Sequence, residues 1–311
     1  MTGKDQPSNN RVQLRLPATS ANLGPGFDAV AIALNFYLEV EAEPADQFSI
    51  RVTGRDAERC SRVDDNLILS VYRKILETNA RPVVPLALKM DNGIPLGMGC
   101  GSSAAGRLAA ITLAVHYGQL GWSDQRILEE ASTLEGHPDN ASACWLGGFV
   151  AAASEGGAVQ VARVVPPPAW RAIVVLPSVP LPTSKARAVL PGNYSREDVV
   201  TNLQSVAMLG LAFAQGRGDL LRVAMRDRVH QPYRAPICPY LPHLLPLAGS
   251  HGILGVSLSG AGSAVLVIVD DERDLAVASE AIRQVLGEMP EAELILASFE
   301  SSGAQLLSQA R

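Results

Sequence analysis

The segment that most restricts the fold is a glycine-rich stretch, PLGMGCGSSAAG, at residues 95–106. Gly97, Gly99 and Gly101 alternate with larger residues, and two serines then open a small-residue helix predicted over residues 102–117. Alternating glycines let successive backbone N–H groups converge on an anion, and the start of the helix adds its positive dipole end. This stretch, called the glycine loop below, predicts a phosphate site. A tight strand-to-helix turn capped by serine is the purely structural alternative.

Two familiar phosphate-binding patterns do not match the glycine loop. A Walker A loop has a lysine directly before the serine or threonine, and no lysine stands there in this chain. A dinucleotide-binding fingerprint spaces its third glycine differently and places an acidic residue about twenty positions further on. The acidic residue nearest that distance, Asp124, follows Ser123 at a predicted helix start. The glycine loop therefore indicates phosphate binding of another kind.

Strand-like and helix-like stretches interleave along the 311 residues, which predicts an α+β or α/β class in two lobes. The pattern RVQLRL alternates like a half-buried strand that begins at residue 11 and stops at Pro17. The proline run at residues 166–168 is the best linker. We therefore expect a disordered tail (1–10), an N-terminal lobe (11–165) and a C-terminal lobe (166–311). Further strands are predicted at residues 30–42, 86–90, 149–153, 171–176, 255–258, 264–269 and 293–298, and helices at 66–79, 102–117, 123–134, 183–190, 195–215 and from 274.

Composition excludes several classes of protein. Hydrophobic residues make up 47% of the chain and the net charge is −5, so intrinsic disorder is excluded and nucleic-acid binding is disfavoured. The polar N-terminus lacks the apolar core of a signal peptide, and no apolar run reaches the roughly 18 residues of a membrane-spanning helix. The four cysteines form no CxxC pair and fit a reducing compartment. We expect a soluble cytoplasmic protein, for which a homodimer is compatible with the sequence.

Three further segments combine a turn-forming backbone with polar side chains. The Asn-Gly segment (residues 17–34) carries Asn22 and Asp28 on either side of a Gly-Pro-Gly turn. The EGHPDN segment (residues 134–148) follows a predicted helix. It contains Glu135, His137, Asp139 and Asn140, and one of its carboxylates could ligate Mg²⁺. The Gly-Ser segment (residues 255–269) joins two apolar strands. Ordinary connections with satisfied polar groups are the alternative for each.

Basic residues are scarce, which draws attention to two short stretches. Lys185 and Arg187 lie on a short predicted helix, TSKAR, and Arg234 lies in a loop, VHQPYR. Two arginines could clamp a carboxylate, because guanidinium binds that group through paired hydrogen bonds. Solvated surface charge is the alternative for each of these residues.

Together the Asn-Gly segment, the glycine loop and the Gly-Ser segment, which contains SGAGSA, resemble the three sequence motifs of the GHMP small-molecule kinases, in order and over nearly the whole chain. Within that superfamily, PATSANLGPGFD, EGHPDN and the pair TSKAR and PYR are similar to the homoserine kinase family. The resemblance implies an α+β, two-lobed GHMP kinase fold, with an N-terminal lobe like ribosomal S5 domain 2 and a ferredoxin-like C-terminal lobe. It also implies transfer of phosphate from MgATP to the side-chain hydroxyl of L-homoserine, a step of threonine biosynthesis.

The resemblance also implies roles for individual residues. ATP and Mg²⁺ would be the cofactors, and L-homoserine the small-molecule partner. Ser103, Asp139 and Asn140 would be catalytic, although phosphoryl transfer does not require a strong base and Asp28 is the other candidate base. Nucleotide binding falls to Asn66, Pro95, Gly97, Gly99, Gly101, Ser102 and Ser103. Substrate binding falls to Asn22, Asp28, His137, Asn140, Arg187, Arg234 and Gly260.

Three positions depart from the family pattern or leave it ambiguous. Cys100 stands where leucine is usual, and Ser263 stands where proline is usual. Mg²⁺ would be held by Glu135 and by Ser102, with Ser103 as the alternative hydroxyl, and Glu129 and Glu130 also precede HPDN and are not excluded. Two alternatives remain: a kinase for a mevalonate-like or sugar-like alcohol, and a non-catalytic ligand-binding relative. The first predicts no arginine pair near the substrate, and the second predicts loss of the serine pair or of the acidic segment.

Overall fold

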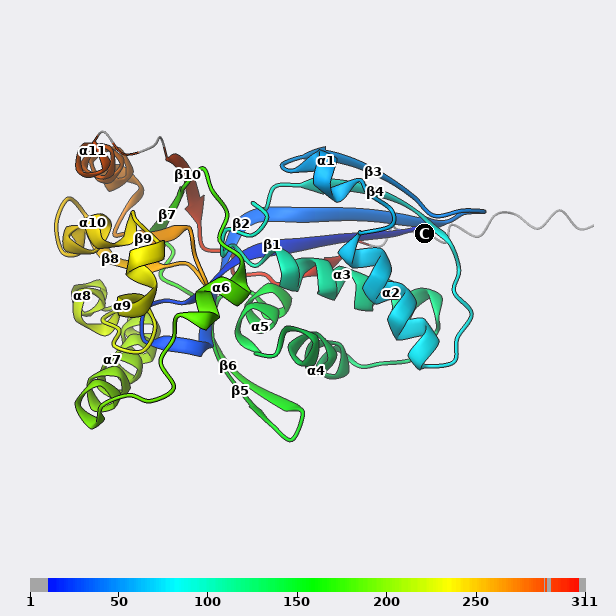
Figure 1. The fold of residues 1–311 in the computed structure, drawn as a ribbon, viewed down its shortest axis with the longest axis horizontal. Helices are drawn as coiled ribbons and strands as arrows, with labels where there is room; N and C mark the ends of the chain where they lie inside the picture. Colours follow the sequence, from blue (N-terminus) through cyan, green and yellow to red (C-terminus); the bar gives the residue numbers. More distant parts are fainter. Residues whose placement is uncertain (1–10, 288, 290–291, 308–311) are drawn as a thin grey trace, which may run out of the picture.

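The chain folds into two β-sheets with helices packed against both (Figure 1). The computed structural model describes residues 11–287, 289 and 292–307, and the predicted disordered tail at residues 1–10 lies outside this part of the chain. All sheet pairings are antiparallel except one, and the helices lie between strands in sequence. The architecture is α+β, as predicted.

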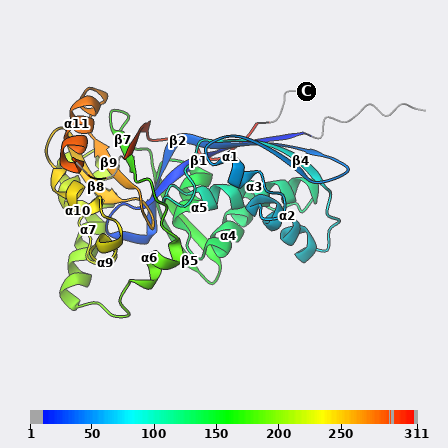
Figure 2. The ribbon, with the colours of Figure 1, turned by 45° about the horizontal axis from the view of Figure 1, so that its top comes forward.

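The first sheet has seven strands in the order β11-β1-β2-β4-β3, with β5 and β6 continuing from β2. β3 and β4 form its parallel pair. Helices α2, α3, α4 and α5 gather on one face of this sheet, which Figures 1 and 2 show from two directions. The strands are β1 (Val12–Asn22), β2 (Gly26–Pro44), β3 (Ser49–Gly54), β4 (Leu86–Asn92), β5 (Phe149–Glu155), β6 (Ala158–Val164) and β11 (Gln305–Leu306). The helices of this half are α1 (Ala57–Cys60), α2 (Leu67–Thr78), α3 (Ser102–Tyr117), α4 (Asp124–Glu135) and α5 (Asp139–Leu146).

The second sheet has the order β10-β7-β9-β8 and follows the ferredoxin-like sequence of two strand–helix–strand units. Its strands are β7 (Arg171–Leu176), β8 (Ile253–Leu258), β9 (Val265–Val269) and β10 (Glu293–Ser298). The α-helices are α6 (Thr183–Ala188), α7 (Arg196–Gln215), α8 (Leu221–Ala224), α9 (Gln231–Arg234), α10 (Leu241–Leu244) and α11 (Leu275–Leu286). Single 3₁₀ turns are η1 (Gly218–Leu220), η2 (Ala235–Ile237), η3 (Leu245–Leu247) and η4 (Glu272–Asp274).

Local capping explains why the helices near the cavity begin where they do. Asn66 precedes α2, and its side-chain oxygen accepts hydrogen bonds from the N–H groups of Ile68 and Leu69. Ser123 caps α4 in the same way, as the sequence predicted. α3 begins directly after Gly101, whose φ of 73° lets the chain turn from the glycine loop into the helix. The predicted helix over residues 102–117 is thus confirmed at both ends.

Two sequence predictions about the strands were wrong. The first strand does not stop at Pro17 but continues to Asn22. Proline has no N–H to donate to the partner strand. The register between β1 and β2 shifts between Pro17 and Ala18, and this irregularity lets the strand continue beyond the proline. The boundary that placed all of residues 166–311 in the C-terminal lobe also fails, because β11 pairs with β1 of the first sheet.

Most buried hydrophobic side chains form a single cluster that runs from the first sheet to one face of the second. Phe149 of β5 stacks on Phe213 of α7, with ring centroids 4.2 Å apart, so the two halves of the chain share this core. A second cluster lies on the other face of the second sheet. No helix in the described part of the chain combines the length and the hydrophobicity needed to cross a membrane.

Candidate functional site

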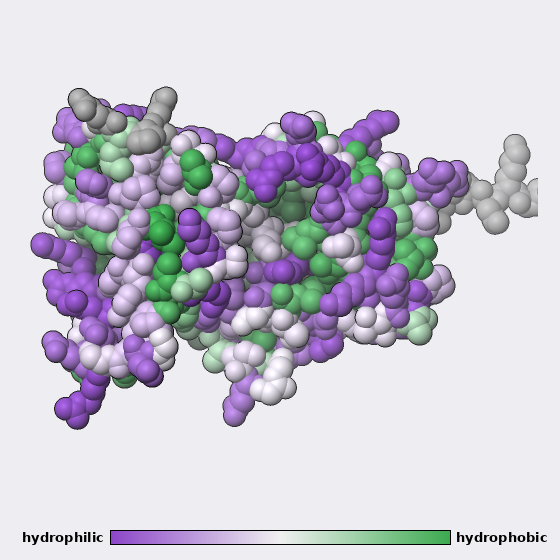
Figure 3. Space-filling model, viewed as in Figure 1, coloured by the Kyte–Doolittle hydropathy of each residue, from purple (hydrophilic) through white to green (hydrophobic). Residues whose placement is uncertain are grey.

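A cavity of about 580 Å³ lies where the two halves meet, and the space-filling view shows the surface hollowed there (Figure 3). Residues of the Asn-Gly, EGHPDN and Gly-Ser segments and of the glycine loop line it together with α6 and α9. Among the predicted site residues, only Pro95 does not line it; that proline faces a neighbouring groove. The fold therefore gathers into one space residues that are far apart in sequence, such as Asn22 and Gly260, which are separated by 238 positions.

The glycine loop forms one wall, and the carbonyl groups of residues 97–101 are directed toward protein partners. Gly97, Met98, Gly99, Cys100 and Gly101 each accept a hydrogen bond, from Leu181, Ala264, Ser259, Thr19 and Ala105 respectively. Within the described chain, the N–H groups of residues 97–101 form no hydrogen bond. The first N–H groups of α3 are also without intrahelical partners, as at any helix start. This row of free donors at a helix N-terminus suits phosphate oxygens.

The far end of the cavity is largely apolar. Leu38, Met90 and Ile94 line it near the start of α2. Asn66 also lines this end, but both ends of its amide bond to protein: the oxygen caps α2 and the nitrogen donates to the carbonyl of Cys60 at 2.8 Å. Asn66 therefore shapes this wall by holding α1 to α2. A flat, mostly apolar ligand group such as a nucleobase suits such a pocket.

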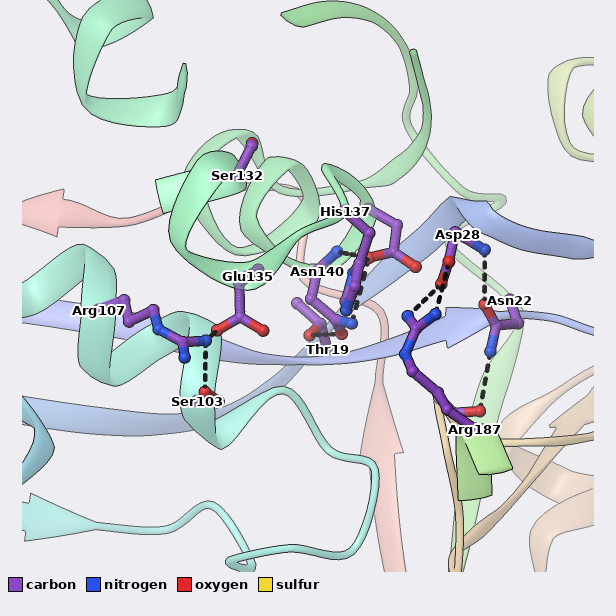
Figure 4. Close-up of polar contacts among 12 residues, drawn as sticks. Thr19, Asn22, Asp28, Ser103, Arg107, Ser132, Glu135, His137, Asn140 and Arg187 are labelled. Atoms are coloured by element: carbon purple, nitrogen blue, oxygen red, sulfur yellow. Dashed lines mark hydrogen bonds and ion pairs between the residues drawn. The ribbon is translucent and has the colours of Figure 1, made fainter. Parts of the chain in front are cut away.

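The EGHPDN segment supplies the centre of the cavity (Figure 4). Asp139 is 1% exposed, and its Oδ1 lies 2.5 Å from His137 Nδ1 and accepts the Asn140 N–H at 2.6 Å. Burial lowers the pKa of His137, but the hydrogen bond and charge of Asp139 outweigh it, so the pKa is raised overall. Thr19 donates to Asn140 Oδ1 at 2.7 Å and fixes that side chain. The hydrogen bonds of Asp139 thus position His137 and Asn140.

The three candidate metal-binding glutamates occupy different places. Glu129 accepts a hydrogen bond from Gln125, and Glu130 pairs with Arg126, so both make contacts along α4 and neither lines the cavity. Glu135, the last residue of α4, does line it. The structure therefore brings only Glu135 of the three to the serines of the glycine loop.

The positively charged side chain of Arg107 lies between Glu135 and the serines of the glycine loop (Figure 4). The guanidinium of Arg107, one turn into α3, donates to Ser103 Oγ at 2.9 Å and forms an ion pair with the Glu135 carboxylate. A hydroxyl and a carboxylate that share a cation are the donors that Mg²⁺ accepts beside phosphate oxygens. These residues fit a divalent cation, and of the two serines expected near Mg²⁺ it is Ser103 whose hydroxyl lies in this position.

The opposite side of the cavity carries Asp28 and Arg187, which pair with each other. Two hydrogen bonds of 2.7 and 3.0 Å join the guanidinium of Arg187 on α6 to both carboxylate oxygens of Asp28 on β2. Asn22 positions this carboxylate: its Oδ1 accepts the Asp28 N–H, and its Nδ2 donates to the carbonyl of Gly260. Asn22 therefore ties the Asn-Gly segment to the Gly-Ser segment.

Arg234 is buried, at 1% exposure, and within the described chain it has no carboxylate in ion-pair distance. Its Nε donates to the Ala186 carbonyl at 3.0 Å, and its Nη1 donates to the Gly260 carbonyl and to His230 Nδ1, both at 3.2 Å. Burial, and then the charge of Arg187, lower the pKa of Arg234. A buried guanidinium that faces a cavity without an acidic partner is suited to an anionic ligand group.

Sequence reasoning missed several side chains that organise the site. His230 lies one helical turn before Arg234, and its Nε2 lies 2.7 Å from the Gly24 carbonyl, so this ring joins α9 to the Asn-Gly segment. Arg107 and Thr19 were also missed. The i to i+4 spacings of Ser103 with Arg107 and of His230 with Arg234 were visible signals, but their other partners are distant in sequence.

Comparison with known proteins identifies the family. Residues 66–148 match the GHMP kinases N terminal domain, and residues 211–288 match the GHMP kinases C terminal domain. A curated homoserine kinase of Solibacter usitatus is 43% identical over 279 residues, which cover 89% of this chain and 91% of that protein. The chain belongs to the homoserine kinase family. A homoserine kinase of Moorella thermoacetica is 41% identical, with 81% of this chain and 86% of that protein covered.

Solved structures support the fold of this homoserine kinase family member. The crystal structure of homoserine kinase from Cytophaga hutchinsonii aligns with a TM-score of 0.82 over 98% of this chain and all of that one, at 23% sequence identity. The mevalonate kinase of L. major aligns with a TM-score of 0.66, at 15% identity, over 97% of this chain and 98% of that one. Both neighbours show the GHMP kinase fold, as the sequence resemblance implied.

Proposed function

We propose that the cavity binds MgATP and L-homoserine side by side and transfers the γ-phosphoryl group to the homoserine side-chain hydroxyl. The products would be ADP and O-phospho-L-homoserine, in threonine biosynthesis and in the cytoplasm. One observation carries the proposal. The free N–H groups of the glycine loop lie at one side of the cavity, and Asp28, Arg187 and Arg234 lie at the other, with the EGHPDN segment between them.

On this proposal, the row of N–H groups at residues 97–101 holds the ATP phosphates, and the apolar end beyond Asn66 takes the base. Glu135 and Ser103 hold Mg²⁺, which neutralises charge that builds up on the phosphates. Ser102 lies next to them at the helix start. The Asn140 amide, fixed by Thr19, is placed to orient the attacking hydroxyl. Asp139 accepts hydrogen bonds from its neighbours, so it serves to position His137 and Asn140.

Substrate recognition follows from the charges on the other side. Homoserine carries an ammonium and a carboxylate on the same carbon, and the pair of Asp28 and Arg187 presents the complementary charges. Binding exchanges the internal ion pair for two external ones, and the substrate carboxylate also reaches the buried Arg234. This exchange selects amino acids over simple alcohols, because a neutral alcohol leaves Arg234 without an anionic partner.

The direct test is coupled ADP release measured with L-homoserine, L-serine and mevalonate at saturating MgATP. Turnover with homoserine alone is the expected result, and faster turnover with mevalonate would replace homoserine with another alcohol as the substrate. Absence of turnover with all three would favour a ligand-binding protein.

A substitution then tests the assignment of the carboxylate clamp. Arg187→Ala should raise the KM for homoserine roughly 10- to 100-fold, the range for loss of a charged hydrogen-bonding partner, with little change in the KM for ATP. Lys185→Ala is the matched control, because Lys185 is an exposed basic residue of the same helix that does not line the cavity. Equal increases in both KM values would place Arg187 outside the amino-acid site.

A further inference from the structure

Arg107 is a charged cavity residue to which the proposed reaction assigns no role. The Arg107 side chain is 23% exposed and the Glu135 side chain is 9% exposed, so their ion pair is largely screened from water. The same guanidinium reaches the hydroxyl of Ser103, the second residue of α3. Both groups are those assigned above to Mg²⁺. In this structure, a positive charge of the protein therefore occupies the place between the proposed metal ligands.

The place of Arg107 on α3 limits where its charge can go. It lies four residues after Ser103, one turn along the helix that starts at the glycine loop, and it lines the cavity with the residues of that loop. A guanidinium cannot share a small carboxylate–hydroxyl site with Mg²⁺, because the two cations repel each other and compete for the same oxygens. A guanidinium released there faces the proposed phosphate site, and guanidinium binds phosphate through paired hydrogen bonds.

We propose that the Arg107 guanidinium occupies the metal site in the nucleotide-free protein and moves from Glu135 to the phosphate groups when MgATP binds. This inference rests on the proposed function only in assigning Glu135 and Ser103 to the divalent cation. Arg107 thus competes with the metal when no nucleotide is present and supports nucleotide binding when the metal arrives with ATP. It is a positioning residue for Glu135 in the first state and a phosphate-binding residue in the second.

The proposal predicts changes of opposite sign in one variant, Arg107→Met. Mn²⁺ binding to the nucleotide-free protein, followed by the loss of the free Mn²⁺ signal in electron paramagnetic resonance, should become roughly fivefold tighter. That is the upper range for removing one partly exposed ion pair that competes for Glu135. Binding of the ATP analogue AMP-PNP in the presence of Mg²⁺, followed by calorimetry, should become roughly tenfold weaker through loss of a charged contact to phosphate.

Three further variants make the test decisive. Arg107→Lys keeps the charge and should leave Mn²⁺ affinity within about twofold of the unaltered protein. Glu135→Gln should remove the tighter Mn²⁺ binding when combined with Arg107→Met, which locates the ion at Glu135. Arg107→Gln is a second neutral variant that keeps a hydrogen bond to Ser103, and it should repeat the tighter Mn²⁺ binding even if the methionine variant fails to fold.

Unchanged or weaker Mn²⁺ binding in the neutral variants would overturn the inference, and so would Mn²⁺ binding that is insensitive to Glu135→Gln. A parallel gain in both Mn²⁺ and AMP-PNP affinity would also overturn it, because Arg107 would then only obstruct the site. None of these measurements uses homoserine or turnover. A failure of the homoserine assay would therefore leave this inference standing, and a failure here would leave the substrate assignment standing.

Discussion

Two glycines of the glycine loop give a matched test of why the loop is built from glycine. Gly97 and Gly99 have similar backbone angles, with φ of 70° and 85°, in the left-handed region that other residues avoid. They differ in their surroundings. A Cβ added to Gly97 would meet its nearest atom, Pro180 Cβ, at an ordinary 3.5 Å, whereas a Cβ added to Gly99 would lie 2.0 Å from the carbonyl oxygen of Ser259.

The expected magnitudes follow from these two facts. Gly97→Ala should lower the free energy of unfolding by about 1–2 kcal/mol, the cost of the left-handed conformation for an L-residue. Gly99→Ala adds overpacking against backbone, which costs about 1–3 kcal/mol more. The Ser259 hydroxyl also donates to the Gly99 carbonyl at 2.7 Å, so a displaced Ser259 disturbs the glycine loop itself. We therefore expect Gly99→Ala, and not Gly97→Ala, to raise the KM for ATP strongly.

Urea unfolding followed by tryptophan fluorescence, together with steady-state kinetics, measures both effects. The decisive quantity is the difference between the two variants, because the backbone cost is common to both and cancels. Equal destabilisation of the two variants would refute the reasoning, since the close approach of Gly99 to Ser259 would then carry no energy. A larger loss of stability in Gly97→Ala than in Gly99→Ala would also refute it, because the steric constraint would then lie at Gly97.

Two further predictions concern titratable groups. Burial lowers the pKa of His230, so stability is complete above the unfolded-state pKa of about 6.5 and declines as pH falls below it. His230→Asn should flatten that decline between pH 7.5 and 5.5 in urea unfolding, and an unchanged slope would contradict it. Cys60 lines the cavity, while the other three cysteines are buried. Because burial raises its pKa, iodoacetamide should label Cys60 faster with rising pH, and MgATP should protect it; labelling that ignores MgATP would place the nucleotide elsewhere.

Local sequence determined the elements around the cavity and hence much of the candidate site. A serine pair after alternating glycines predicted the start of α3, and the helical spacing of apolar residues within residues 66–79 predicted α2. These signals are readable because caps and glycine turns act within four or five residues. The motif residues could be listed for the same reason, since each segment is continuous.

The remaining features depend on contacts that no local pattern encodes. The ion pair of Arg107 and Glu135 joins residues 28 apart, and His230 reaches Gly24 across 206 residues. Such pairs exist only after α3 has packed on α4 and after α9 has docked on the Asn-Gly segment. Pro17 illustrates the same limit, because the shifted register that keeps it within β1 is set by the partner strand.

The ion pairs of Asp28 with Arg187 and of Arg107 with Glu135 indicate how a chain with few charges builds a site for highly charged ligands. The pair of Arg107 and Glu135 is largely buried and the pair of Asp28 and Arg187 is partly exposed, and pairing offsets the desolvation cost of these charges before any ligand arrives. Each pair matches one ligand: an ammonium and a carboxylate replace the first, and a metal ion with its phosphates replaces the second. On this reasoning, a compound with a carboxylate but no ammonium displaces Asp28 from Arg187 and leaves the Asp28 charge uncompensated. Discrimination against such compounds then arises from the protein charge left behind as much as from the contact that is missing.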